Sequence, residues 1–279
     1  IDIMQGQVAA ALPQVEERLA QVEAWWKQHR AGQRVPEAPD AEVLARAFIS
    51  GLDIANDAHR ARDDWASALR CTDAMLEVRR ALQRPAEEIG AARMNRAVEL
   101  GQLQRFGEAR AELEDCLQFF QNNPAVKAKV LSSLADLFDR QGDVAQAITQ
   151  ERRSLALCEQ LPDPADRAIS HNNLAKYLDR RGTPSALAES SCHLLAAFIY
   201  FLAAGIGQHV QTMLGSYARI FRRARAARTE LAVPRVAELL ADPAFHPLDQ
   251  WLLQRQVPPA ALQATVDQFL ARARQAAEE

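Results

Sequence analysis

Apolar side chains recur along the chain at intervals of three and four residues, the spacing of one face of an α-helix. The segment 129–155 carries this pattern twice, with a Gly142–Asp143 turn between the two runs. Glycine after a helix and aspartate before the next one are favoured capping residues, so the segment predicts two amphipathic helices. The apolar positions are Val130, Leu131, Leu134, Ala135 and Phe138 in the first helix and Ala147, Ile148 and Leu155 in the second.

The pattern returns about every forty residues. In each copy a small residue is expected where the two antiparallel helices approach most closely, because a large side chain would hold the axes apart. We call this place the small-residue position. It holds Asn56, Ala97, Ala135, Ala175 and Gly215, at successive steps of 41, 38, 40 and 40 residues.

The second helix of each pair also has a recurring start. Trp65 and Ala68 stand in register with Phe106 and Ala109, and the alanine recurs as Ala147. One helix pair cannot bury its apolar face alone, so neighbouring pairs must stack. Strong helix formers dominate the composition and no segment alternates like a strand. The sequence therefore predicts an all-α fold of stacked antiparallel helix pairs.

This pattern resembles the tetratricopeptide repeat (TPR), whose basic unit is about 34 residues. The segment His171–Gly182, HNNLAKYLDRRG, is similar to the longer variant found in kinesin light chains and in bacterial signalling proteins. The resemblance covers residues 41–240 and implies a right-handed superhelix, an α-solenoid, of about five repeats. Three residues depart from it: Asp63 and Gln104 replace the glycine of two turns, and Asn56 is large for its place.

The flanks are expected to cap the array. Residues 1–40 predict an N-terminal capping helix and a loop, and residues 241–279 predict C-terminal capping helices. Trp25 and Trp26 lie about 100° apart on a helix, so both are not expected to be fully buried. Prolines divide the C-terminal part into three helices, expected near 234–241, 247–255 and 259–276.

Composition excludes several classes of partner. The net charge of −3 gives no electrostatic reason to expect nucleic acid or an anionic membrane. The longest apolar run, Leu194–Gly207, is shorter than the ~20 residues of a bilayer span and predicts a buried helix. The cysteines are far apart and form no CxxC, so we expect free thiols in a reducing cytoplasm. They are Cys71, Cys116, Cys158 and Cys192.

Signs of catalysis are absent from the sequence. The six histidines form no HxxxH or HExxH pair, and no nucleotide-binding glycine motif or nucleophile elbow occurs. We therefore expect no enzyme activity, no metal and no cofactor. His171 is expected to be a packed or solvated histidine. Five arginines between residues 219 and 228 favour a solvated helix end, with phosphate, RNA or an acidic segment as the alternative contact.

The TPR resemblance implies a binding surface. In that family the first helix of each pair lines the inner groove, through positions at fixed offsets from the small residue. Polar side chains there can hold a ligand's backbone or carboxylates. The mixture of Asp and Arg argues against a uniformly positive floor. The residues carried over are Asn172, Lys176, Asp179 and Arg180; Ser132, Asp136, Asp139 and Arg140; and Thr212, Ser216 and Arg219.

Two functions follow from this reading. The first is a protein-interaction module that holds a peptide or protein segment in the groove. The second is the regulatory sensor arm of a larger multidomain protein, such as a bacterial signalling ATPase or a caspase-like protease, in which the repeats would relay a trigger to a catalytic domain. The initial Ile1, in place of Met, favours a piece of a longer chain.

Overall fold

The structure, a computed structural model, describes residues 2–33 and 40–278. It is 83% helical, with thirteen α-helices, and these residues contain no strand. They divide into unit 1, Ile1–Phe120, and unit 2, Gln121–Glu279. The all-α prediction is confirmed, whereas the predicted loop 35–40 lies, apart from Asp40, outside the described residues.

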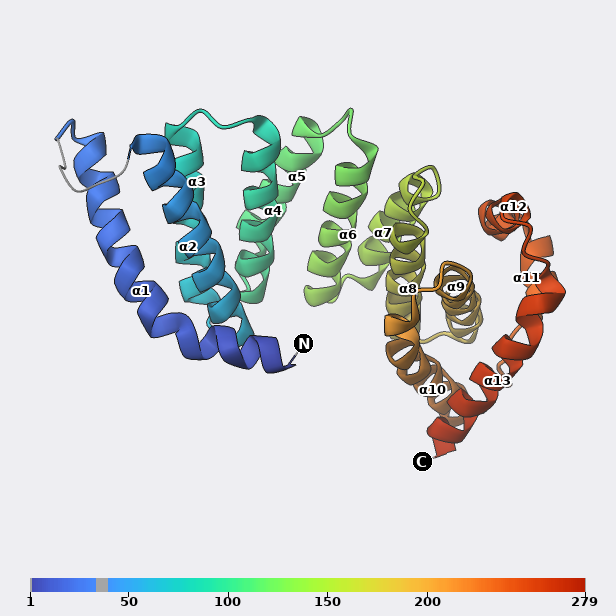
Figure 1. Ribbon diagram of the computed structural model, residues 1–279. Coiled ribbons are helices and arrows are strands. Elements are labelled where there is room, and N and C mark those ends of the chain that lie inside the picture. Colours follow the sequence, from blue (N-terminus) through green and yellow to red (C-terminus); the bar gives the residue numbers. More distant parts are fainter. Residues whose placement is uncertain (1, 34–39, 279) are drawn as a thin grey trace. The chain divides into compact units, whose positions relative to one another are not determined.

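Unit 1 contains five helices, and each packs on the next in the chain (Figure 1). Trp26 is buried in its core while Trp25 is only half-buried, as expected for neighbours on one helix. The helices are α1 (Asp2–Arg30), α2 (Ala41–Ala61), α3 (Trp65–Ala81), α4 (Ala86–Gln102) and α5 (Phe106–Phe119).

Unit 2 contains two further helix pairs and a C-terminal group. Its α10 packs on α9 and on the last helix, α13 (Figure 1). The three predicted C-terminal helices are present at nearly the expected bounds. The elements are α6 (Pro124–Arg140), α7 (Val144–Cys158), α8 (Pro164–Arg181), α9 (Pro184–Ala203), η1 (Gly207–His209), α10 (Val210–Ala226), α11 (Val236–Ala241), η2 (Pro243–Phe245), α12 (His246–Gln254) and α13 (Pro259–Glu278).

The turns inside the helix pairs explain two departures from the repeat pattern. Gly142 and Gly182 have φ values of 84° and 71°, in the left-handed region. Asp63 and Gln104 take the same conformation, at 57° and 60°. Three of these turns also share one backbone hydrogen bond. The amides of Asp64, Arg105 and Asp143 each donate to the carbonyl of the residue five positions earlier. The turn is therefore the same without glycine, at a cost of about 1–2 kcal/mol.

The small-residue position behaves as predicted in two helices of unit 2 and one of unit 1. Ala97, Ala135 and Ala175 are at most 1% exposed. The assignment of Gly215 to this position is wrong. Gly215 is exposed, and a Cβ atom built on it would meet no heavy atom within 4 Å. The reason is that α10 packs on the distant α13 rather than on a helix that follows it directly.

Asn56, the large residue in this position, is accommodated by hydrogen bonds. Its Nδ2 donates to the carbonyl of Ala68 at 2.8 Å and to Glu99 Oε1 at 2.7 Å, and it lies 3.0 Å from Thr72 Oγ1. Thr72 Oγ1 also donates to Glu99 Oε1, at 3.0 Å. Glu99 is fully buried, and burial raises its pKa. The Asn56 cluster, formed by Asn56, Thr72 and Glu99, thus joins α2, α3 and α4.

A second close approach lies between α4 and the end of α5. A Cβ atom on Gly90 would come 2.2 Å from the ring of Phe120, and Cys116 Sγ lies 3.7 Å from the Gly90 carbonyl. We expect Gly90→Ala to lower the free energy of unfolding by about 1–3 kcal/mol, because the Phe120 ring must move out of a packed core. Urea unfolding followed by circular dichroism measures this.

The control for Gly90 is Gly107, near the start of α5. A Cβ atom there meets open space, so Gly107→Ala should be neutral or stabilising by up to about 1 kcal/mol through helix propensity. Equal losses in both variants would show that the Phe120 contact is not the cause.

The apolar run predicted to be a buried helix, Leu194–Gly207, forms the second half of α9, which ends at Ala203, before the run does. Leu194–Phe201 is buried throughout and lies at the centre of the unit 2 core. By length and composition α9 could cross a membrane, since an 18-residue window of it has a mean hydropathy of 1.5. However, 72% of that window is buried inside the protein, as in a core helix. The four cysteines are free thiols, and Cys192 alone among them is not fully buried.

Candidate functional site

Charged side chains from α6, α8 and α10 form two adjacent sets of ion pairs in unit 2, one between α6 and α8 and one between α8 and α10. The partners lie forty residues apart, because equivalent positions of successive first helices face one another: Lys176 pairs with Asp136, and Arg219 with Asp179. We call the two sets together the charged ladder. Its members are Asp136, Asp139, Arg140, Lys176, Asp179, Arg180, Arg219 and Arg223.

Asp139 joins α6 to α8. Its carboxylate lies 3.0 Å from Arg180 Nη1 and 3.7 Å from Lys176 Nζ. The Asp139 side chain is only 2% exposed, whereas that of Arg180 is 53% exposed. The carboxylate is thus placed beneath the cations, and the guanidinium remains at the surface.

Asp179 repeats this arrangement between α8 and α10. Its side chain is 4% exposed and lies 2.8 Å from Arg219 Nε and 3.2 Å from Arg223 Nη1. Arg223 also donates to the backbone carbonyl of Asp179. Both arginine side chains stay about half exposed.

Asp136 lies at the half-exposed end of the ladder. Arg140 Nε donates to Asp136 Oδ2 at 2.7 Å, and Lys176 Nζ to Oδ1 at 3.0 Å. Burial by itself would raise the pKa of Asp136, but these hydrogen bonds and charges outweigh it, and the pKa lies below its ordinary value. The carboxylate is therefore ionised at neutral pH.

The ladder presents an excess of positive charge at the protein surface. It contains five cations and three carboxylates, and two of the carboxylates are almost completely buried. Each guanidinium has five N–H donors in a planar fork, so an arginine that contacts one buried carboxylate keeps other donors for a second one. The arrangement is suited to bind carboxylates of another polypeptide.

A pocket of about 160 Å³ opens beside the ladder, between α6, α7 and α8. Glu151, fully buried on α7, accepts hydrogen bonds from Ser132 at 2.9 Å and Ser170 at 2.7 Å. Burial raises the pKa of Glu151 against these hydrogen bonds. Ile169, 44% exposed, lines the same pocket. The pocket therefore combines an exposed aliphatic side chain with a fully hydrogen-bonded polar floor.

Most of the predicted groove residues meet in the ladder. Of the other predicted residues, Ser132 lines the pocket, Asn172 is half-buried on α8, Ser216 is half-buried on α10 and Thr212 is exposed there. Two of the predicted groove residues, Asp139 and Asp179, are buried beneath their cationic partners, so the cations rather than these carboxylates reach the surface.

Three residues of this surface are absent from the predicted groove residues, although Arg223 belongs to the arginine run between residues 219 and 228. Arg223 follows Arg219 by one helical turn, a spacing that the sequence does contain. Glu151 is a charge inside the apolar stripe of α7, which signals a buried polar contact. Asn173, which donates to Ser132 Oγ at 3.1 Å, had no distinguishing signal beside Asn172.

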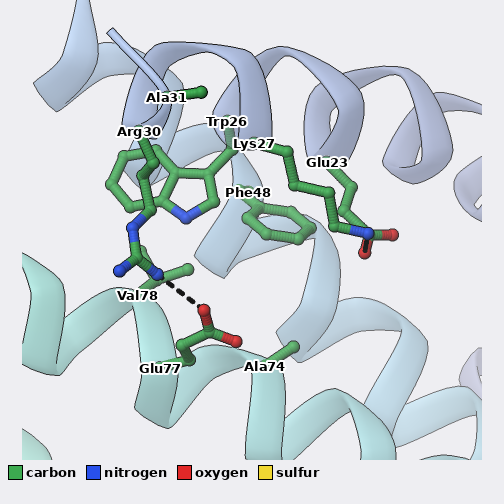
Figure 2. Close-up of a pocket in the computed structure, with 9 residues that line it drawn as sticks. All are labelled: Glu23, Trp26, Lys27, Arg30, Ala31, Phe48, Ala74, Glu77 and Val78. Atoms are coloured by element: carbon green, nitrogen blue, oxygen red, sulfur yellow. Dashed lines mark hydrogen bonds and ion pairs between the residues drawn. The ribbon is translucent and has the colours of Figure 1, made fainter.

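Unit 1 has a pocket of its own, of about 310 Å³, between α1, α2 and α3 (Figure 2). Trp26 and Phe48 line it, and an ion pair of 2.6 Å between Arg30 and Glu77 connects α1 to α3 (Figure 2). A second pair joins Lys27 to Glu23. Positive and negative side chains are paired at the edge of this pocket, so it favours no charged partner. The ladder is therefore the better candidate site.

Comparisons with known proteins support the fold. No protein-family model and no curated protein matches the sequence. Solved structures do match, among them the crystal structure of BtubC (BKLC) from P. vanneervenii, a kinesin-light-chain-like protein of TPR type. The match has a TM-score of 0.58 and 11% sequence identity, and covers 93% of this chain and 92% of that one. The chain thus has a TPR-like helical-repeat fold.

Proposed function

We propose that the chain is a protein-interaction module that binds a partner polypeptide on the surface formed by α6, α8 and α10. The observation that carries this proposal is the charged ladder, in which Asp139 and Asp179 are buried and their arginine partners are exposed. Ion pairs that served stability alone would not need surplus cations at the surface. The free cysteines agree with a cytoplasmic setting, which we propose as well.

The chemistry of the surface favours an acidic partner segment. Carboxylates of the partner would bind the outward N–H groups of Arg180, Arg219 and Arg223, which are about half exposed. An aliphatic side chain of the same segment would enter the pocket beside Ile169. A volume of about 160 Å³ suits one side chain rather than a small-molecule ligand, for which sites are roughly 300–1,000 Å³.

The test is an array of synthetic twelve-residue peptides in which the number of Asp and Glu residues and the presence of one Leu are varied. We expect the full chain to select peptides that combine several acidic residues with one Leu. The variant Lys176→Ala, Arg180→Ala, Arg219→Ala should bind the best peptide at least about tenfold more weakly, since one charge-assisted hydrogen bond contributes about 1.5–3 kcal/mol.

A matched variant separates this surface from general charge. Arg153→Ala, Arg181→Ala, Arg225→Ala removes three exposed cations from the same unit but leaves the ladder intact. It should keep the affinity at physiological salt within about twofold, because these cations belong to no ion pair of the ladder and salt screens exposed charges. Equal losses in both variants, or a selection with no acidic preference, would rule out the ladder as the binding surface.

A further inference from the structure

Two histidines in unit 2 share one hydrogen bond in the core. The Nδ1 atoms of His171 on α8 and His193 on α9 are 2.8 Å apart, and the side chains are almost fully buried. At this distance one Nδ1 must donate a proton and the other must accept it. The pair can exist when neither ring is charged or when one ring is charged. It cannot exist when both are, because two N–H groups would then face each other.

The surroundings can balance one positive charge on the pair, provided that His193 carries it. Its Nε2 lies 3.8 Å from Glu189, and Arg152 donates to the same Glu189 oxygen at 2.6 Å. The interaction with His193 and the hydrogen bond from Arg152 lower the pKa of Glu189 to about 2. A permanent carboxylate therefore faces the outer side of His193.

His171 lies on the apolar side of the pair. Its ring stacks on Tyr200 at 5.8 Å and on Phe245 at 5.9 Å between centroids. Burial, and then the neighbouring His193, lower the pKa of His171 well below its ordinary value. Other charged groups lie beyond the rings: Arg167 over Tyr200, Glu159 near Tyr200, Asp242 near Cys192, and Arg255 over the ring of Trp251.

The C-terminal segment packs on this pair. Phe245 of η2 contacts both histidine rings, at centroid distances of 5.9 and 5.2 Å, and Trp251 of α12 lies 5.1 Å from Tyr200. Both Phe245 and Trp251 are buried. The attachment of residues 243–254 to α8 and α9 therefore depends on an intact histidine pair.

We propose that the His171–His193 pair makes the attachment of residues 243–254 sensitive to acid. A second proton on the pair breaks the Nδ1–Nδ1 hydrogen bond and places a charge against Phe245, which has no group to balance it. The segment then leaves α8 and α9, and both histidines become hydrated. This inference concerns a different part of unit 2 from the ladder and does not depend on the proposed function.

The direction of the pH effect follows from linkage. A solvated histidine has an ordinary pKa of about 6.5, so the released state can bind a proton on each ring, whereas the shared Nδ1–Nδ1 hydrogen bond allows the attached state no more than one. Release thus takes up one proton below that pH. The attachment is fully stable above about pH 6.5 and weakens as the pH falls, with the release equilibrium rising about tenfold for each further pH unit.

Amide hydrogen exchange of the full chain, followed by mass spectrometry, tests this. Rates are divided by the intrinsic exchange rate at each pH to give protection factors. We expect the protection of α12, His246–Gln254, to fall about tenfold between pH 6 and pH 5. Helix α6 contains no histidine and contributes no residue to this site, so it serves as a control inside the same molecule, with little change over this range.

Variants locate the effect. His171→Asn keeps a hydrogen-bonding atom near the place of Nδ1, and His171→Phe keeps the ring against Phe245; neither side chain titrates. Both should reduce the pH response of α12 to less than about threefold, while replacing the exposed His246 with Gln should leave it unchanged. The proposal is wrong if α12 of the unmodified chain keeps its protection down to pH 5, or if α6 loses protection equally.

Discussion

Tyr217→Ala is expected to lower the free energy of unfolding of unit 2 by about 3–5 kcal/mol, the cost of removing a large aromatic ring from a core. Tyr217 is fully buried on α10, and its ring contacts Phe221 and Phe269. Its hydroxyl donates to the carbonyl of Ser191 on α9 at 2.6 Å. The side chain thus connects α10 to α9 and to α13, and urea unfolding of the full chain measures its contribution.

Tyr217→Phe is the control for this prediction. It keeps the ring and removes only the hydrogen bond to Ser191, a loss of about 0.5–1.5 kcal/mol. If Tyr217→Ala and Tyr217→Phe lower the free energy of unfolding equally, ring packing does not hold α10 in place. Since α10 carries Arg219 and Arg223, Tyr217→Ala should also weaken the peptide binding proposed for the ladder.

Asn56→Ala is expected to destabilise unit 1 by about 1–3 kcal/mol, although alanine is the residue that the repeat pattern favours at this position. Removing the Asn56 amide leaves the buried Glu99 with Thr72 as the remaining donor of the Asn56 cluster. Because burial raises the pKa of Glu99, the carboxyl is more readily neutral in acid. The cost should therefore be smaller at pH 4 than at pH 7, as measured by urea unfolding at both values.

A double-mutant cycle with Glu99→Leu tests the cause. Once the buried carboxylate is gone, Asn56→Ala should cost at least about 0.5 kcal/mol less than in the unmodified chain, since contacting residues are coupled. Glu99→Gln keeps the acceptor oxygen without charge and should be nearly neutral at pH 7. Additive effects of Asn56→Ala and Glu99→Leu would contradict this account.

The helical repeat could be predicted from sequence because its physical causes are local. Apolar spacing, capping residues and a small side chain at the helix crossing are each visible within one repeat, and Ala135 and Ala175 lie as expected. The Gly215 assignment failed because the helix that packs on α10 is α13, which begins more than thirty residues further along the chain. Neither the small residue nor its spacing carries information about such a distant partner.

The ladder could be predicted only as a set of residues. Asp179 and Arg180 were both placed in the groove, but adjacent positions on a helix differ by about 100° in direction, and only Asp179 is buried. Small rotations of α6 and α8 decide which side chain turns inward, and the sequence does not fix them. The His171–His193 contact had no signal at all, since its two residues come from different helices and match no spacing motif.

The two buried glutamates have a consequence for how the chain opens. In an array of helix pairs, where contacts are between neighbours, unfolding can proceed pair by pair from an end. Glu99 accepts from α2 and α3 while lying on α4, and Glu151 accepts from α6 and α8 while lying on α7. If one of these helices leaves, a buried carboxylate loses a donor. Each glutamate therefore makes three consecutive helices one cooperative block, so local fluctuations within either unit involve helix triplets rather than single repeats.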